Sequence, residues 1–114
     1  MQVTEAVKAL SEAVRQSPEY LEYQRCREEI NQDAAIKALV DEYRKLQSRV
    51  QLRMLSGQGA DDDDARRFQQ LGALLFADAR TSGFLMAEMR LQKMMADVFE
   101  ALTNAAGMQL PLPL

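Results

Sequence analysis

The chain has 114 residues, of which 47% are hydrophobic and 27% are charged, and this is a globular rather than a disordered composition. Aromatic residues make up only 6% and tryptophan is absent. This favours helices packed on helices over a β-sandwich, which relies on β-branched and aromatic residues. The net charge of −3 weakens an assignment to nucleic-acid binding, because such domains usually carry a basic excess.

Residue types that enzymes and secreted proteins commonly need are scarce. Histidine, the commonest general base and metal ligand, is absent. The one cysteine, Cys26, cannot form an intramolecular disulfide and fits a reducing compartment. Charges begin at Glu5, and no stretch reaches the roughly 18 apolar residues of a membrane span. We therefore expect a cytoplasmic protein that is not an enzyme, holds no cofactor or metal and does not contact a membrane.

The first two predicted helices occupy the first 30 residues. Residues 4 to 15 place Val7, Leu10 and Val14 on one face at helical spacing. Ser17 as an N-cap, with Pro18 at the first helical position, predicts the start of a second helix. The apolar positions of that second helix follow at steps of three and four, at Tyr20, Tyr23, Cys26 and Ile30.

The third predicted helix, residues 33 to 56, starts at Asp33 as its cap and has a heptad-like apolar seam. The seam consists of Ile36, Leu39, Tyr43, Leu46 and Val50. A helix of about 24 residues would be about 36 Å long. A compact domain of this size does not need such a helix, so we expect an elongated molecule.

A linker at residues 57 to 60, followed by four consecutive aspartates, separates this helix from the next. The following helix has Phe68, Leu71, Leu74, Leu75 and Ala79 as its expected buried positions. Residues 80 to 83 should break it, with Thr81 or Ser82 capping a last long helix over residues 82 to 104. Residues 108 to 114, which contain Pro111 and Pro113, are expected to form a flexible tail after a single domain of residues 1 to 107.

The last helix has more apolar surface than one neighbouring helix can cover. One seam contains Phe84, Leu91, Met95, Val98 and Leu102, and a second, to one side, contains Leu85, Met89 and Phe99. We favour a second subunit over the chain's own helices as the cover. The candidate subunit-interface or partner-binding residues are Leu39, Tyr43, Leu46, Val50, Met86, Met89, Leu91, Met95, Val98 and Leu102.

Two features that suggest metal or thiol chemistry have simpler interpretations. The acids Asp61 to Asp64 are consecutive, whereas a calcium loop needs alternating oxygens, a central glycine and a closing glutamate. We interpret them as solvated acids that meet the positive end of the next helix. Cys26 lies in step with Tyr23 and Ile30, which indicates a small buried residue, and Arg25 and Arg27 are expected on other sides of the helix.

Two exposed-face interpretations remain open. Four methionines, Met86, Met89, Met94 and Met95, are either ordinary core residues or a protein-binding face that can repack against different partners. The basic residues Arg44, Lys45, Arg49 and Arg53 are interrupted by acids and lack an aromatic platform. A solvated helix face therefore explains them better than an RNA track does.

The segment that runs from Ser17-Pro18-Glu19-Tyr20 through Tyr23, Ile30 and Asp33 to Tyr43-Arg44-Lys45-Leu46-Gln47 has a recognisable order and spacing. It resembles the YlbF/YmcA family, which includes the YheA-type proteins, over about residues 4 to 105. The matching positions are helix-packing positions rather than catalytic ones.

The resemblance implies a small all-α cytoplasmic protein that forms dimers or larger oligomers. Known members regulate competence, sporulation and biofilm formation through a complex that assists the membrane-bound ribonuclease Y in RNA processing. YheA-type members have no clear role. Some members hold iron–sulfur clusters through cysteines, but Cys26 is alone here, so we do not carry that function over.

We therefore predict an all-α, elongated bundle of about five helices, with two long antiparallel helices and completion by dimerisation. The predicted function is a non-enzymatic regulatory adaptor that acts through protein–protein interaction and forms a homo-oligomer. Two alternatives are an RNA-binding accessory subunit of a ribonuclease complex and an oligomeric helical protein of unassigned role.

Overall fold

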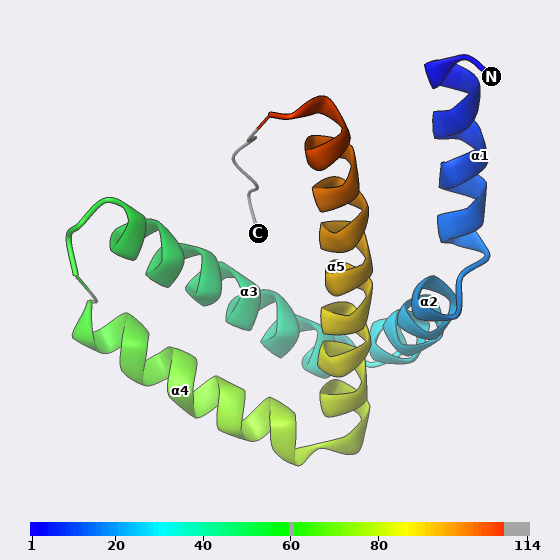
Figure 1. The fold of residues 1–114 in the computed structure, drawn as a ribbon. Helices are drawn as coiled ribbons and strands as arrows, with labels where there is room; N and C mark the ends of the chain where they lie inside the picture. Colours follow the sequence, from blue (N-terminus) through cyan, green and yellow to red (C-terminus); the bar gives the residue numbers. More distant parts are fainter. Residues whose placement is uncertain (60, 109–114) are drawn as a thin grey trace. The chain divides into compact units, whose positions relative to one another are not determined.

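The computed structural model describes residues 1–59 and 61–108. In this part of the chain the secondary structure consists of five helices, which confirms the all-α prediction (Figure 1). They are α1 (Val3–Arg15), α2 (Pro18–Asn31), α3 (Ala34–Leu55), α4 (Asp62–Ala77) and α5 (Ala79–Ala106). Across these described residues, no helix has both the length and the apolar character that crossing a membrane requires.

Side-chain oxygens cap the starts of α2, α3 and α4. Ser17 Oγ accepts a hydrogen bond from the Tyr20 amide at 3.2 Å, and Asp33 accepts from the amides of Ala35 and Ile36 at 3.1 and 3.2 Å. Each bond satisfies an amide that has no partner inside its own helix. Both predicted helix starts are therefore confirmed. Asp61 caps α4 in the same way.

The chain divides into two compact units, which we describe separately. The central unit is Arg25–Leu85, and the terminal unit combines Met1–Gln24 with the segment from Met86 onward. Helices α2 and α5 each contribute residues to both units, because the divisions fall within them.

The central unit is built on an antiparallel hairpin of α3 and α4 (Figure 1). Its buried side chains include Val40 and Leu46 of α3 and Leu71 and Leu75 of α4. In the described residues α4, rather than α5, is the helix that packs along α3. The predicted pairing of the two long helices is therefore replaced by a pairing of consecutive helices, because a short connection returns the chain directly.

The turn of this hairpin uses glycine where other residues would be strained. Gly57 and Gly59 have φ angles of 73° and 71°, in the left-handed region that favours glycine. Helix α4 begins at Asp62, so three of the four consecutive aspartates lie in its first turn rather than before it. The prediction that they meet the positive end of this helix is confirmed.

A pair of stacked aromatic rings joins the two helices of the hairpin, and a glycine beside the rings allows the helices to approach closely. The rings of Tyr43 and Phe68 stack with centroids 4.8 Å apart and an interplanar angle of 20°. One turn beyond Phe68, a Cβ placed on Gly72 would lie 3.4 Å from Tyr43 Cε1. Gly72 thus leaves room for the tyrosine ring between the helices.

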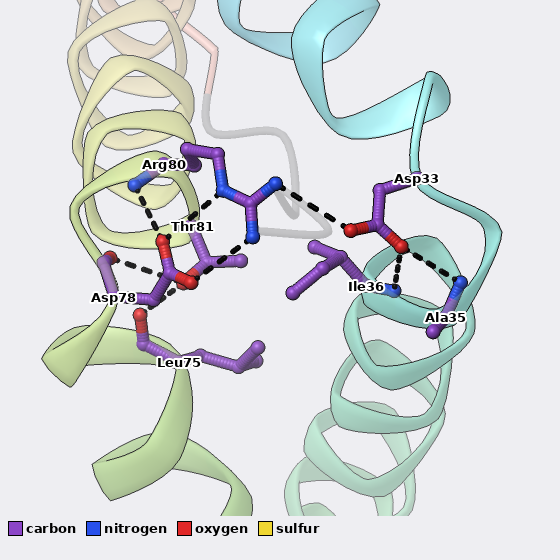
Figure 2. Close-up of polar contacts among 7 residues, drawn as sticks. All are labelled: Asp33, Ala35, Ile36, Leu75, Asp78, Arg80 and Thr81. Atoms are coloured by element: carbon purple, nitrogen blue, oxygen red, sulfur yellow. Dashed lines mark hydrogen bonds and ion pairs between the residues drawn. The ribbon is translucent and has the colours of Figure 1, made fainter.

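The sequence-based boundary between the last two helices is wrong. The break falls at Asp78, and Arg80, Thr81, Ser82 and Gly83 all lie inside α5. Asp78 caps the new helix by accepting from the Arg80 amide at 2.8 Å. Thr81 is fully buried, and its hydroxyl bonds the carbonyls of Leu75 and Asp78 across the corner (Figure 2).

Two residues expected to be buried in α4 are not. Leu74 is 59% exposed. It lies about 100° around the helix from Leu75, beyond the side that α3 covers. Ala79 is exposed and belongs to α5.

The terminal unit contains α1 and the greater part of α5. None of the 13 residues of α1 is buried. Helix α5 continues to Ala106, two residues beyond the predicted end. Of the predicted flexible tail, residues 109–114 lie outside the described residues.

Candidate functional site

An apolar groove lies between α1 and the second half of α5, within the terminal unit. Its volume is about 410 Å³. Apolar side chains of both helices line it, and Ser11 and Arg15 complete the lining. The apolar residues are Val7, Leu10 and Val14 of α1 and Met95, Val98, Phe99 and Leu102 of α5.

The α1 wall follows from the periodicity of its sequence. Val7, Leu10 and Val14 recur at steps of three and four, which places them on one face of a helix. That face normally packs against a hydrophobic core. Here Val7 and Leu10 remain exposed, so α1 presents a core-type face that the described chain leaves uncovered.

The α5 wall is also partly open. Met95 is 43% exposed and Leu102 is 58% exposed, while Val98 between them is half-buried. A helix with charged residues only on its outer side would normally bury these positions. Exposed apolar surface that is gathered in one place, rather than scattered, is typical of an interaction site.

Charged residues near the groove are paired with each other. Arg15 Nη1 lies 2.7 Å from Glu12 Oε1 on α1, and Lys93 Nζ lies 3.1 Å from Asp97 Oδ1 on α5. Because Arg15 is the one charged residue among those that line the groove and has Glu12 beside it, the lining has no strong net charge. Its chemistry therefore suits an apolar helix face better than a phosphate or a charged small molecule.

The structure brings together only some of the predicted interface residues. Met95, Val98 and Leu102 meet in the groove. Met86 and Met89 are exposed and line a different pocket with Glu19, Arg90 and Lys93. The methionines at 86, 89 and 95 thus lie at the surface. Leu91 is half-buried and lines neither of these two pockets.

The predicted interface residues of α3 lie in the central unit. Leu46 is 2% exposed, so its own chain already covers it. Tyr43 stacks on Phe68, and Leu39 and Val50 are half-buried. A substitution at Leu46 would therefore test the folding of the hairpin rather than a contact between subunits.

The groove also contains residues that the sequence analysis did not select. Val7, Leu10 and Val14 form one predicted helix face but are not among the predicted interface residues, and neither is Phe99. The signal for the three α1 residues was the amphipathic spacing of that helix. None of the residues of α1 is buried. Which helix would share this groove could not be read from local periodicity.

The four consecutive aspartates and the cysteine make local contacts with neighbouring residues. Asp61 accepts hydrogen bonds from two amides, and Asp64 lies 3.2 Å from Arg49. In the described residues no three His, Cys, Asp or Glu side chains gather as a possible metal site. Cys26 is 4% exposed, as expected for a small buried residue. Contrary to expectation, Arg25 reaches it, with Nη2 at 3.6 Å from Sγ.

Basic residues of the hairpin are largely engaged by acids or rings. Arg49 pairs with Asp64, and Arg67 pairs with Glu42. The guanidinium of Arg44 lies 5.1 Å from the centre of the Phe84 ring. The ion pairs of Arg49 and Arg67 agree with a solvated helix face, whereas Arg44 is half-buried against a buried ring.

Comparison with known proteins extends over almost the whole chain. A UPF0342 protein of Symbiobacterium thermophilum is 28% identical over 103 residues, which cover 90% of this chain and 92% of the relative. A UPF0342 protein of Streptococcus pyogenes serotype M4 is 30% identical over 89 residues, which cover 78% of this chain and 79% of the relative.

Solved structures share the fold. A protein of unknown function (DUF964) from Bacillus stearothermophilus matches with a TM-score of 0.76 at 17% identity, and the match covers 92% of both chains. A chain from the crystal structure of Bacillus subtilis RicA in complex with RicF matches with a TM-score of 0.61 at 18% identity. That match covers 92% of this chain and 93% of the other.

The family model described as "Control of competence regulator ComK, YlbF/YmcA" matches residues 3–105, which include all but the last residue of the five helices. The chain therefore belongs to the YlbF/YmcA family.

Proposed function

We propose that this chain is a non-enzymatic regulatory adaptor that acts through protein–protein contact, with the α1–α5 groove as its contact surface. The observation that carries the proposal is the groove itself, because two amphipathic helices face it with apolar side chains that remain exposed. Membership of a family described by control of a competence regulator supports a regulatory role.

We propose a second copy of this chain as the first occupant of the groove. An apolar groove between two helices accepts the apolar face of a third helix. Helix α1 has such a face and no buried residue. If the grooves of two copies meet face to face, the α1 of each copy packs its apolar face against the groove of the other. The same contact thus satisfies both exposed surfaces, as expected for a symmetric interface.

The solution mass by light scattering across a dilution series tests this assembly. The wild-type protein should give a mass of two or more chains. Val98→Asp should give a monomer, because an unpaired charge in an apolar contact costs several kcal/mol. Asn104→Asp is the matched control: it adds the same charge to an exposed position of α5 outside the groove lining, and it should keep the wild-type mass.

A Val98→Asp protein with an unchanged helical circular-dichroism spectrum and the wild-type mass would overturn the proposal. A monomeric wild-type protein would also exclude the second copy as occupant. If the variant loses its helical spectrum, Leu102→Gln provides a milder change, since Leu102 is exposed and its replacement buries no charge.

The finer proposal is that the assembled adaptor contacts further regulatory proteins and assists RNA processing by ribonuclease Y. A similar fold has been crystallised as RicA in complex with RicF, so this fold supports a contact with another protein. Direct RNA binding is less well supported, because Arg49 and Arg67 are paired with acids. A gel shift with single-stranded RNA at low salt should therefore show no complex.

A further inference from the structure

A methionine lies among the residues that line the α1–α5 groove. Met95 is 43% exposed, and the other apolar side chains of the lining are valine, leucine and phenylalanine. Its sulfur atom sets methionine apart from them. A thioether accepts an oxygen atom from a peroxide, whereas aliphatic and benzene side chains are inert to the same reagent. The apolar lining thus contains a side chain that mild oxidation changes.

The reaction of this side chain with hydrogen peroxide needs no further reactant. A lone pair of Sδ attacks one peroxide oxygen, the O–O bond breaks and a sulfur–oxygen bond forms, while the other oxygen leaves as water after proton transfer. Sulfur is oxidised by two electrons, and the peroxide is reduced by two. The product, methionine sulfoxide, is of similar size but is polar and accepts hydrogen bonds.

Access to solvent distinguishes Met95 from the other sulfur atoms near it in sequence or of higher reactivity. Cys26 is 4% exposed and Met94 is half-buried, so a dissolved peroxide reaches them less readily. Met89 is 57% exposed, but it lies about 120° around α5 from Met95 and does not line the groove. Met89 is therefore an internal reference, because its oxidation should leave the groove lining unchanged.

A sulfoxide at Met95 is unfavourable once the groove is covered by an apolar surface. The two polar side chains of the lining are already engaged on α1, since Ser11 donates to the Val7 carbonyl at 2.8 Å and Arg15 donates to Glu12 at 2.7 Å. A covered sulfoxide oxygen would therefore lose its water without gaining a donor, which costs free energy. In an open groove the same oxygen stays hydrated, so oxidation favours the open state.

We propose that Met95 is a site of reversible oxidation, and that its conversion to the sulfoxide weakens the contact between two copies of the chain. This inference rests on the proposed function of the groove. Oxidation acts on the free chain, because a copy that covers the groove also covers the sulfur. The modification thus keeps separate copies apart and spares assembled ones. A reductase that takes two electrons from thiols reverses it, and the oxygen leaves as water.

The first experiment measures the rate of oxidation by dilute hydrogen peroxide at several protein concentrations. Peptide mass spectrometry with fragment-ion sequencing gives the sulfoxide fraction at Met95 and Met89 in one sample, separates Met95 from Met94 and follows Cys26. The ratio of the Met95 rate to the Met89 rate should fall several-fold as the concentration rises through the range in which light scattering shows assembly. A ratio that is constant across that range would contradict the protection of Met95 by a second copy.

The second experiment measures the solution mass across a dilution series before and after peroxide treatment. The dissociation constant of the wild-type assembly should rise by about tenfold or more on oxidation. Met95→Leu keeps an apolar side chain of similar volume without sulfur, so its mass should not respond to peroxide. Met89→Leu is the matched control, and it should respond as the wild type does. Methionine sulfoxide reductase with a dithiol should restore the mass of the oxidised wild type.

Two results would refute the inference while leaving the proposed function intact. One is an unchanged mass in wild-type protein whose Met95 is shown to be oxidised, and the other is a Met95→Leu protein that dissociates in peroxide as the wild type does. Loss of the helical circular-dichroism spectrum on oxidation would also count against it, because dissociation would then follow from unfolding. A wild-type protein that is monomeric before peroxide is added rejects the proposed contact itself, and the effect of oxidation on it as well.

Discussion

Arg67 of α4 holds Glu42 of α3 through two parallel contacts, with Nε 2.9 Å from Oε1 and Nη2 3.1 Å from Oε2. Both residues lie on the outside of the hairpin, and their contact joins its two helices. The hydrogen bond from Arg67 lowers the pKa of Glu42 below its ordinary value. The contact thus stabilises the hairpin only while Glu42 is ionised.

This pair predicts a pH-dependent contribution to stability. A folded-state pKa below the unfolded value adds stability above the unfolded pKa of about 4.3, and the addition is lost as the pH falls through the folded pKa. The urea midpoint of Glu42→Gln should therefore lie below that of the wild type at pH 7, and the difference should close in acid. In an Arg67→Gln background, Glu42→Gln should have little further effect. A difference that persists unchanged at pH 3 would contradict this account.

Among the polar residues of the α4–α5 corner, we expect substitution of Thr81 to lower the stability most. Its side chain is fully buried, and its hydroxyl bonds the carbonyl of Leu75, which has no partner within the end of its own helix. Thr81→Val keeps the shape but leaves that carbonyl unsatisfied, so we expect a loss of about 1–3 kcal/mol in the free energy of unfolding by urea.

Thr103→Val is the control for this substitution, because the Thr103 hydroxyl bonds the carbonyl of Glu100 in an exposed contact near the C-terminal end of the same helix. It should change the free energy of unfolding by less than about 0.5 kcal/mol. Equal losses at both positions would show that the corner does not depend on the Thr81 hydroxyl.

The cap of α4 can be tested separately from its acidic first turn. Asp61 accepts hydrogen bonds from the amides of Asp63 and Asp64 at 3.0 and 3.1 Å. Asp61→Ala should lower the free energy of unfolding by about 0.5–2 kcal/mol, whereas Asp61→Asn retains a capping oxygen and should cost little. Asp62→Asn, at the first helical position, distinguishes the loss of charge from the loss of the cap. Thermal unfolding followed by circular dichroism measures all three.

The effect of a substitution at Gly72 on stability should depend on the size of the new side chain. Alanine is favoured over glycine in a helix by about 1 kcal/mol, and its Cβ would touch Tyr43 at an ordinary distance of 3.4 Å. Gly72→Ala should therefore leave stability unchanged or raise it slightly. Gly72→Leu should displace the Tyr43 ring from Phe68 and cost about 1–3 kcal/mol. A urea titration that ranks leucine above alanine would show that the ring moves freely.

The helix starts that the sequence predicted correctly are those where one side chain stands alone as a candidate. Ser17 precedes a proline, and Asp33 precedes a long apolar seam. The start of α5 had competing signals, since Asp78, Thr81 and Ser82 are all good N-cap residues. Burial of Thr81 beneath the corner decided between them, and burial is a tertiary effect that local sequence does not reveal.

Of the two walls of the groove, only the α5 wall was predicted from the sequence. The apolar width of α5 indicated that Met95, Val98 and Leu102 need a cover, and these residues do line the groove. The other wall, α1, lies some 80 or more positions away in sequence, and periodicity says which face of a helix is apolar but not which helix it meets. That residues 1–107 form a single domain stays a prediction.

Helix α1 has a consequence for how the assembly could be followed. A helix of 13 residues with no buried side chain is near the length at which an isolated helix is marginal in water. Its amide protons should therefore exchange quickly in a single chain and slowly once its apolar face is covered. Backbone hydrogen exchange at Val3–Arg15 would then report the fraction of grooves that are occupied, in a mixture and without any label.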